Sequence, residues 1–415
     1  MASWVLLGIG CLALLLAANV LWPVRRFGGP AVVSFFAGWL AGELALYAAG
    51  ATLAAAGVLA ALGAYATDVG RAGIALALVA VALFVAGHVR AARAHHAVTQ
   101  ALADLEDPAR VTLPPRPVVS RRHLAFHAYG DVTLRLDVHA SRDHAGPRPV
   151  LLYVHGGAWM LGHRERQGLP LMKHMAARGW VCVSVDYRLS PRATFPDHLV
   201  DVKRAIVWVR DHAADLDADP SFLAIAGNSA GAHLASLAAL TANRRTYQPG
   251  FEDRDTGVDA CAGFDGIYDF TDRWGHFPHP GMRRLLERHV MKARVADAPD
   301  AFAAASPVDQ VHAGAPPFLL VHGTHDSLAP TGESRRLLAA LRTTPRSAAF
   351  YVEVPGAQHA FEVFPSTRTR HVVRGTARFL HWARERARLR DLQANREDTP
   401  ARSSAPRVAT RSARA

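Results

Sequence analysis

The chain has 415 residues, enough for two or three structural units, and it carries a formal net charge of +12. Of its 47 basic and 35 acidic residues, only six fall in the first 90 positions, so an apolar N-terminal quarter precedes a body of ordinary composition. This division excludes a disordered protein, a small disulfide-stapled module and a wholly cytosolic enzyme.

Residues 1–90 are predicted to form a helical membrane anchor with about three crossings. The three apolar runs are Ser3–Trp22, Ala31–Leu62 and Ala72–Val89. The first run has 20 uncharged residues, enough to cross about 30 Å of hydrocarbon as a helix. A secretory signal carries its positive charge before the apolar run, whereas Arg25 and Arg26 follow this one. We therefore expect a retained, multi-pass anchor that contacts membrane lipid.

Basic residues near the ends of the runs predict the orientation. If Arg25/Arg26 and Arg90/Arg93 both lie on the cytoplasmic side, an even number of crossings separates them. Three crossings and a cytoplasmic body are then favoured, whereas a hairpin turn near Gly50 would reverse the parity. Glu43 lies in the second run and is either a functional carboxylate or a side chain that reaches the membrane surface, with the second favoured.

Residues 91–122, with a proline cluster near their end, are predicted to be a juxtamembrane linker. Residues 123–390 alternate short apolar runs with helical patterns, as in a mostly parallel α/β sheet flanked by helices. The predicted strands are Val132–Ala140, Pro149–Val154, Trp180–Asp186, Phe222–Ala226, Ala260–Ile267, Phe318–Gly323 and Ala348–Val354. The predicted helices are Leu169–Arg178, His198–Ala214, Ala230–Thr241, Glu333–Leu341 and Arg370–Arg390.

Two further segments of the body differ in composition. Residues 270–305 are predicted to be a lid-like insertion between strands, and residues 391–415 a disordered basic tail without apolar periodicity. Residues 366–415 contain 13 Arg against four acidic residues, which accounts for most of the net charge. The remainder of the chain lacks the basic face that a nucleic-acid-binding protein requires, so we expect no nucleic-acid partner.

The sequence Gly227-Asn228-Ser229-Ala230-Gly231 fits the pattern G-x-S-x-G between a predicted strand and a predicted helix. In that context the pattern is typical of a nucleophile elbow, a strained turn that holds the serine Oγ out of the sheet. The residues two before and two after the serine must be small, and both are glycine. A glycine-rich helix cap is the less favoured alternative, so we predict Ser229 as a nucleophile.

A second motif, His155-Gly156-Gly157-Ala158-Trp159, follows the strand that ends at Val154. Glycines there allow backbone N–H groups to approach a substrate carbonyl, and the N–H of Ala230, directly after the serine, supplies another donor. A plain turn with a buried Trp159 is the alternative. Two motifs in this order favour an oxyanion-binding site.

A serine nucleophile needs a base and an orienting acid. Asp326 follows the strand that ends at Gly323, and His359 follows the last predicted strand, 33 residues later. The competing acids are Asp265, Asp269 and Glu353, and none has a following histidine at a comparable position. A metal cluster formed by Asp326 with His322 and His325 is a less favoured interpretation.

The chain order Ser, Asp, His is that of α/β-hydrolases. With HGGAW, DYRLSP at 186–191, GNSAG and HGTHDSLAP at 322–330, the segment 123–390 resembles the hormone-sensitive-lipase type of α/β-hydrolase carboxylesterases. The apolar N-terminus is similar to that of membrane-anchored actinobacterial esterases and lipases. Asn228 departs from the family, which often has an acidic residue beside the nucleophile.

The resemblance implies a mechanism without cofactor or metal. Ser229 would attack an ester carbonyl, His359 would transfer the proton, and Asp326 would orient His359. The N–H groups of Gly156, Gly157 and Ala230 would form the oxyanion hole, and the substrate would be a small-molecule or lipid ester. Two alternatives remain: an amide-directed hydrolase such as an arylformamidase, and a catalytically silent hydrolase fold that acts as a binding module.

Overall fold

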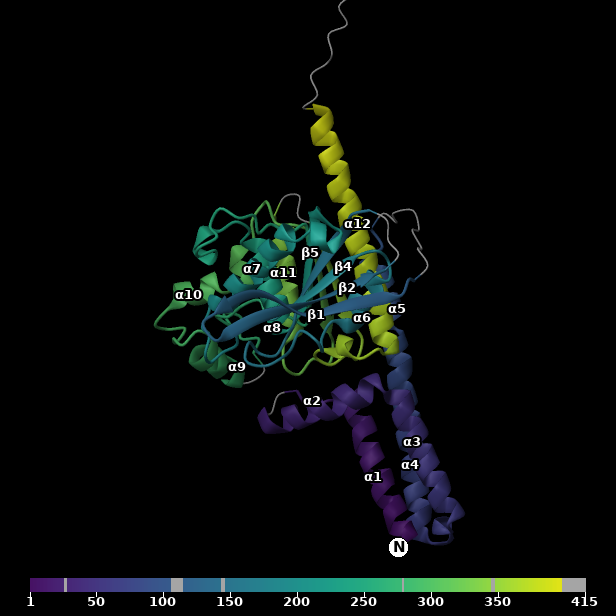
Figure 1. Ribbon diagram of the computed structural model, residues 1–415. Coiled ribbons are helices and arrows are strands. Elements are labelled where there is room, and N and C mark those ends of the chain that lie inside the picture. The colour runs from purple at the N-terminus through teal and green to yellow at the C-terminus, as the bar shows by residue number, and fades with distance from the viewer. Residues whose placement is uncertain (26–27, 106–114, 143–145, 278–279, 345–347, 398–415) are drawn as a thin grey trace, which may run out of the picture.

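The computed structural model describes residues 1–25, 28–105, 115–142, 146–277, 280–344 and 348–397 (Figure 1). The body is built on an eight-stranded sheet with strand order β1-β2-β4-β3-β5-β6-β7-β8. β2 pairs antiparallel with β1 and β4, and the other neighbouring strands are parallel. The strands are β1 Val118–Tyr129, β2 Val132–Ser141, β3 Arg148–Val154, β4 Val181–Val185, β5 Ala218–Asn228, β6 Ala260–Phe264, β7 Phe318–Gly323 and β8 Ala349–Val354. The predicted mostly parallel α/β sheet is confirmed.

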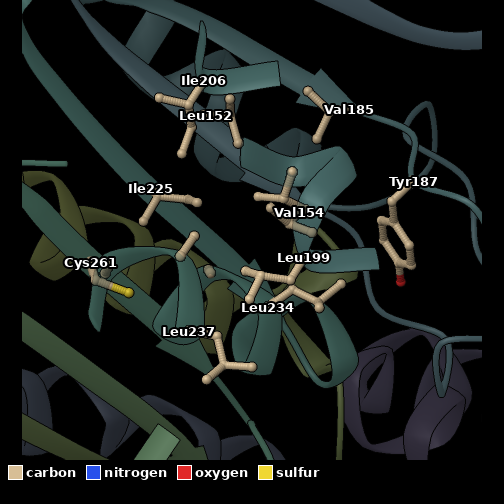
Figure 2. Packing of buried hydrophobic residues seen from close by; sticks show 14 of the residues in the cluster. Leu152, Val154, Val185, Tyr187, Leu199, Ile206, Ile225, Leu234, Leu237 and Cys261 are labelled. Carbon is tan, nitrogen blue, oxygen red and sulfur yellow. The ribbon is translucent and has the colours of Figure 1, made fainter. Parts of the chain in front are cut away.

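Helices cover both faces of the sheet because its buried strands carry apolar side chains on both sides. In β3, Leu152 and Val154 face one apolar cluster, which Figure 2 shows against Leu199, Leu234 and other residues. Leu151 and Tyr153 face a second cluster on the opposite side of the sheet. The first cluster includes side chains of α7 Asp197–Asp211, α8 Ala230–Leu240 and α11 Thr331–Arg342; the second includes α5 Ala94–Ala101, α6 Leu169–Ala176 and α12 Thr367–Glu397.

The structure differs from the prediction at both ends of the body. The predicted linker 91–122 contains α5 and the start of β1, and its residues 106–114 lie outside the described part. α5 buries Ala94 and Val98 against α12, where a Cβ atom added at Gly375 would lie 2.3 Å from Val98 Cγ1. β1 is a largely exposed edge strand with register shifts, so its alternation in the sequence is weak. α12 extends to Glu397, into the predicted tail, whose residues 398–415 lie outside the described part.

The N-terminal region contains the helices α1 Ala2–Leu21, α2 Gly28–Glu43, α3 Ala45–Ala61 and α4 Asp68–Ala92. Two helical stretches, Ala2–Leu21 and Asp68–Ala101, are long and apolar enough to cross a membrane. The region predicted as a second crossing is not one straight helix, because the chain bends by 87° between α2 and α3. In Figure 1, α2 lies crosswise next to the body, at an angle to α1, α3 and α4.

Glu43, at the end of α2, does not reach toward solvent as favoured from the sequence. Its carboxylate forms an ion pair with Arg368 at the start of α12, and both side chains are only 2% exposed. Ser366 Oγ donates a second hydrogen bond of 2.6 Å to the same carboxylate. These contacts join the apolar N-terminal region to the body, and they could not be read from the sequence because the partners are far apart in the chain.

Replacing Glu43 with glutamine should destabilise the protein by about 3–5 kcal/mol, because the Arg368 guanidinium would stay buried without a counter-charge. Thermal unfolding of the full chain in detergent measures this effect. Glu385→Gln is the matched control, because Glu385 and its partner Arg388 are 45% and 71% exposed and an exposed pair contributes about 0–1 kcal/mol. Equal unfolding midpoints for Glu43→Gln and wild type would contradict the prediction.

Candidate active site

Ser229 lies in a sharp turn between β5 and α8, with φ 53° and ψ −122°. A non-glycine residue is strained in this conformation, and such strain gathers at functional sites. Cβ atoms added at Gly227 and Gly231 would lie 2.4 Å from Gly231 O and 2.1 Å from Val154 O. The turn therefore has the tight packing that an elbow motif requires, and only glycine fits on either side of it.

The backbone of this turn is held to the neighbouring strand. Ser229 N–H donates to Phe264 O at 2.8 Å, which ties the turn to the end of β6. Within the described residues, the Ser229 hydroxyl makes no hydrogen bond, so the structure does not join it to His359. Catalytic hydrogen bonds are often long before substrate binds.

Asp326 and His359 are brought together by the loops that follow β7 and β8. The two strands are parallel neighbours, so their carboxyl ends lie at the same edge of the sheet. His359 Nδ1 lies 2.7 Å from Asp326 Oδ2. The other carboxylate oxygen, Asp326 Oδ1, accepts hydrogen bonds of 2.8 Å from the backbone N–H groups of Leu328 and Ala329. The carboxylate is therefore held in place while it orients the imidazole.

The charges of this pair depend on each other. Burial opposes ionisation of Asp326, but His359 and His322 hold the pKa of Asp326 well below its usual range. Burial lowers the pKa of His359, whereas the Asp326 carboxylate raises it, and the net pKa of His359 is about 9. Once deprotonated, a histidine oriented in this way can act as a general base.

This pKa predicts the pH dependence of any reaction in which His359 is the base. Protonated His359 cannot accept a proton, so kcat/KM should rise as the pH increases through the pKa of His359, above the ordinary value near 6.5. Asp326→Asn should move the inflection to lower pH, because the carboxylate no longer favours the imidazolium. Steady-state rates between about pH 6 and about pH 10 measure both effects. A flat profile for the wild type over this range would contradict the prediction.

Two residues beside this pair were not assigned a role from the sequence. His322 Nε2 lies 3.1 Å from Asp326 Oδ2, and His322 Nδ1 lies 2.8 Å from Ser334 Oγ. Asp265, considered above as a competing acid, accepts hydrogen bonds from Gly323 N–H at 2.8 Å and Ala360 N–H at 2.9 Å. Asp265 thus joins the loops after β7 and β8. The sequence signal that could have indicated this role is the position of Asp265 directly after β6, at the edge of the sheet where the loops with Asp326 and His359 also lie.

The three predicted oxyanion donors differ in their hydrogen bonds. Gly156 N–H donates to Asn228 Oδ1 at 2.8 Å and to Gln167 Oε1 at 2.7 Å, and its part in an oxyanion hole stays a prediction. Among the described residues, no hydrogen bond occupies the N–H of Gly157 or of Ala230. Gly157 has φ 128°, and a Cβ atom there would lie 2.2 Å from Leu161 O. Asn228, where this chain departs from the family, positions the loop through its hydrogen bond with Gly156 N–H.

Asp186 and Arg188 of the DYRLSP motif each pair with a residue on another segment. Arg164 Nη1 donates to Asp186 Oδ2 at 2.6 Å, and Arg188 Nε donates to Asp201 Oδ2 at 2.8 Å. Both acidic residues thus have arginine partners on other segments. The contacts organise the loop after β4 and the start of α7.

The segment 270–305, predicted to be a lid-like insertion, lies between β6 and β7, and its residues 278–279 lie outside the described part. It contains α9 Pro280–Leu285, a π-helical turn at Leu286–Val290 and α10 Pro299–Ala304. Leu286, Val290 and Phe302 are buried in the cluster that also contains α8. Part of the insertion is therefore packed on the body, and its function as a lid stays a prediction.

Among the described residues, the two groups whose ligand atoms lie close enough to hold a metal ion include neither His322 nor His325, which the sequence suggested as ligands together with Asp326. Ligand atoms of Asp265, Asp326 and His359 lie within 4.8 Å of one another. Both oxygens of Asp265 accept backbone hydrogen bonds, and His359 contacts Asp326, so this group has its own hydrogen-bond network. A second group is His123, Asp137 and Glu165. The positive Arg164 guanidinium lies beside it and donates to Asp137.

Helix α2 also contacts the loop that carries His359. Trp39 Nε1 donates to Ala360 O at 3.0 Å, and the Trp39 ring packs against Phe364 with centroids 4.7 Å apart. The Phe35 ring lies 6.4 Å from the His359 ring in an edge-on arrangement. The sequence suggested no such contact, because α2 was assigned to a membrane crossing.

Comparisons with known proteins agree with this fold. The model of the BD-FAE family matches residues 136–341. Esterase LipC of Mycobacterium tuberculosis is 40% identical over 290 residues, which cover 67% of this chain and 70% of LipC. Esterase LipQ of the same organism is 48% identical over 232 residues, covering 56% of this chain and 55% of LipQ. The chain thus spans about half the length of LipQ.

A solved structure is also similar to this chain. Esterase 2 of Thermogutta terrifontis, phosphonylated by sarin, superposes with a TM-score of 0.55 and 25% identity. The match covers 66% of this chain and 96% of that esterase. With the resemblance in HGGAW, GNSAG and HGTHDSLAP, these matches show that the chain belongs to the α/β-hydrolase carboxylesterases of the hormone-sensitive-lipase type.

Proposed function

We propose that the protein is a membrane-anchored serine hydrolase that cleaves carboxylic esters. The observation that carries the proposal is the 2.7 Å contact of His359 Nδ1 with Asp326 Oδ2. Both residues lie in loops that follow neighbouring strands. Together with Ser229 they have the chain order Ser, Asp, His that is typical of α/β-hydrolases. Relatives named esterases support the same reaction class.

In the proposed mechanism, Ser229 Oγ attacks the ester carbonyl carbon while His359 Nε2 takes the serine proton. The negative oxygen of the tetrahedral intermediate accepts hydrogen bonds from the N–H groups of Gly157 and Ala230. His359 then returns the proton to the departing alcohol and leaves an acyl-enzyme. Water attacks the acyl carbon while His359 takes its proton. His359 then gives this proton to Ser229 Oγ as the bond to the acyl carbon breaks, and the carboxylic acid leaves. Asp326 keeps Nε2 free as the base by holding Nδ1–H.

A comparison of substrates and of a covalent probe tests the reaction class. The full chain in detergent should hydrolyse p-nitrophenyl esters faster than aryl formamides, and a fluorophosphonate probe should label it at one serine. Faster cleavage of formamides would favour an amide-directed hydrolase. A folded protein that stays unlabelled and inactive on both substrate types would contradict the enzyme proposal and favour a binding module.

We further propose that α1, α3 and α4 cross the membrane and that the body lies on the cytoplasmic side. Arg90 at the end of α4 donates to Leu21 O at the end of α1, so both helices end at the same level, next to the body. Arg25 and Arg93 add positive charge there, as expected of cytoplasmic boundaries. α3 has 17 residues, the lower limit for a crossing.

Labelling of single cysteines in intact cells tests the orientation. In a Cys11→Ala background, an impermeant maleimide should label Tyr65→Cys, between α3 and α4, and spare Leu389→Cys in α12. Both positions are exposed, at 59% and 58%. The reverse labelling pattern would place the body outside the cell.

A further inference from the structure

Helix α2 has two apolar faces with different surroundings. One face contacts the body through Phe35 and Trp39, beside the loop that carries His359. The other face is exposed and consists of apolar side chains: Val32 is 41% exposed, Val33 70%, Phe36 59% and Leu40 52%. Between Gly28 and Gly42 the helix has no charged residue. A helix with this composition is unsuited to water on its exposed face.

The position of α2 follows from its attachments. Asn19 Nδ2, near the end of α1, donates to Ser34 O at 2.8 Å, and Ser34 Oγ accepts from Val24 N–H at 2.8 Å. At its other end the Glu43–Arg368 ion pair attaches α2 to the body. Because the chain bends by 87° between α2 and α3, α2 lies across the direction of the candidate membrane helices (Figure 1).

The depth of α2 follows from α4. From Asp68 to Arg90 an α-helix rises about 33 Å, close to the roughly 30 Å thickness of the hydrocarbon layer. If α4 crosses, Arg90 lies at the membrane surface, where a Cβ atom added at Gly356 would be 3.0 Å from Arg90 Cδ. Gly356 is three residues before His359. The loop with His359 and the adjacent helix α2 therefore lie at the level of the lipid headgroups.

We infer that α2 is an interfacial helix whose exposed face inserts into the bilayer and whose other face lines the active site, so that the enzyme takes its ester directly from the membrane. The inference rests on the proposed esterase function and specifies its substrate class, an ester with a long apolar chain dissolved in the bilayer. Its ester group lies near the headgroups, at the depth of His359. The contact of Phe35 with the His359 ring places an apolar wall beside the proposed base.

Two esters of the same alcohol test the inference on the full chain in phosphatidylcholine vesicles. p-Nitrophenyl acetate reaches the site from water, whereas p-nitrophenyl palmitate dissolves in the bilayer. The variant Val33→Asp/Phe36→Asp should lower palmitate hydrolysis by about tenfold or more and change acetate hydrolysis by less than about twofold, because charges on this face disfavour insertion. Leu389→Asp, also at an exposed apolar side chain but far along α12, should change neither rate.

The outcomes separate this inference from the proposed function. A wild type that cleaves neither ester, or a Ser229→Ala variant as active as wild type, would contradict the esterase proposal itself. With an active wild type, unchanged palmitate hydrolysis in the double variant would overturn the inference. An equal loss on both esters would also overturn it, since α2 would then support the fold and not the delivery of substrate.

A measurement independent of activity tests the location of α2. In a Cys11→Ala background, Val33→Cys carries an environment-sensitive fluorophore, and the vesicles contain lipids with a nitroxide quencher near the headgroup. The fluorophore at position 33 should be strongly quenched, and the same fluorophore on Leu389→Cys should not. Absence of quenching at position 33 in a protein that is otherwise inserted would overturn the inference.

Discussion

Replacing Ser229 with alanine is expected to lower kcat for ester hydrolysis by roughly 10⁴ to 10⁶, as for the loss of a nucleophile in other catalytic triads. The variant should fold, because alanine keeps the Cβ atom and the backbone contact of residue 229 with Phe264 O. KM should change little if the hydroxyl acts mainly in the chemical step.

The measurement needs a control for local packing around the elbow. Ser236 lies in α8, the helix that follows Ser229, and its side chain is fully buried. Its side-chain partner is Cys261 Sγ, 4.0 Å away. Ser236→Ala should therefore retain activity within a few-fold of wild type. Labelling by a fluorophosphonate should be lost in Ser229→Ala alone. Equal rates for Ser229→Ala and wild type would show that Ser229 is not the nucleophile.

Replacing Asp326 with asparagine should lower kcat by about 10⁴, because the amide can bond the wrong tautomer of His359 and no longer stabilises the imidazolium. Asp326 is preferred over Asp265 as the orienting acid because its Oδ2 contacts His359 Nδ1, while Asp265 oxygens accept backbone N–H groups. The variant also tests the pH profile described above.

Asp265→Asn is the discriminating comparison. Asparagine would present an amide group to one of the two backbone N–H donors, of Gly323 or Ala360, so this variant should lose stability more than activity. Thermal unfolding and kcat are to be measured for both variants. A larger loss of kcat in Asp265→Asn than in Asp326→Asn, with folding intact, would reverse the two assignments.

Much of the fold and the candidate site could be predicted from the sequence because the relevant signals are local. Short apolar runs predicted every parallel strand of the sheet. The glycines around Ser229 predicted a tight turn, and a turn conformation depends on a few adjacent residues. The loops with Asp326 and His359 follow successive strands, and parallel neighbours bring such loops to one edge of the sheet.

Other features were decided only by the tertiary structure, because they depend on which distant segments pack together. Asn228 and Gln167 both accept a hydrogen bond from Gly156 N–H, and Glu43 pairs with Arg368, 325 residues later in the chain. The 87° bend before α3 separates one apolar stretch into two helices with different directions. Hydropathy shows that the segment of α2 is apolar, but it does not show which part of the protein the segment packs against. The position of α2 against the loop of His359 depends on contacts with residues far away in the chain.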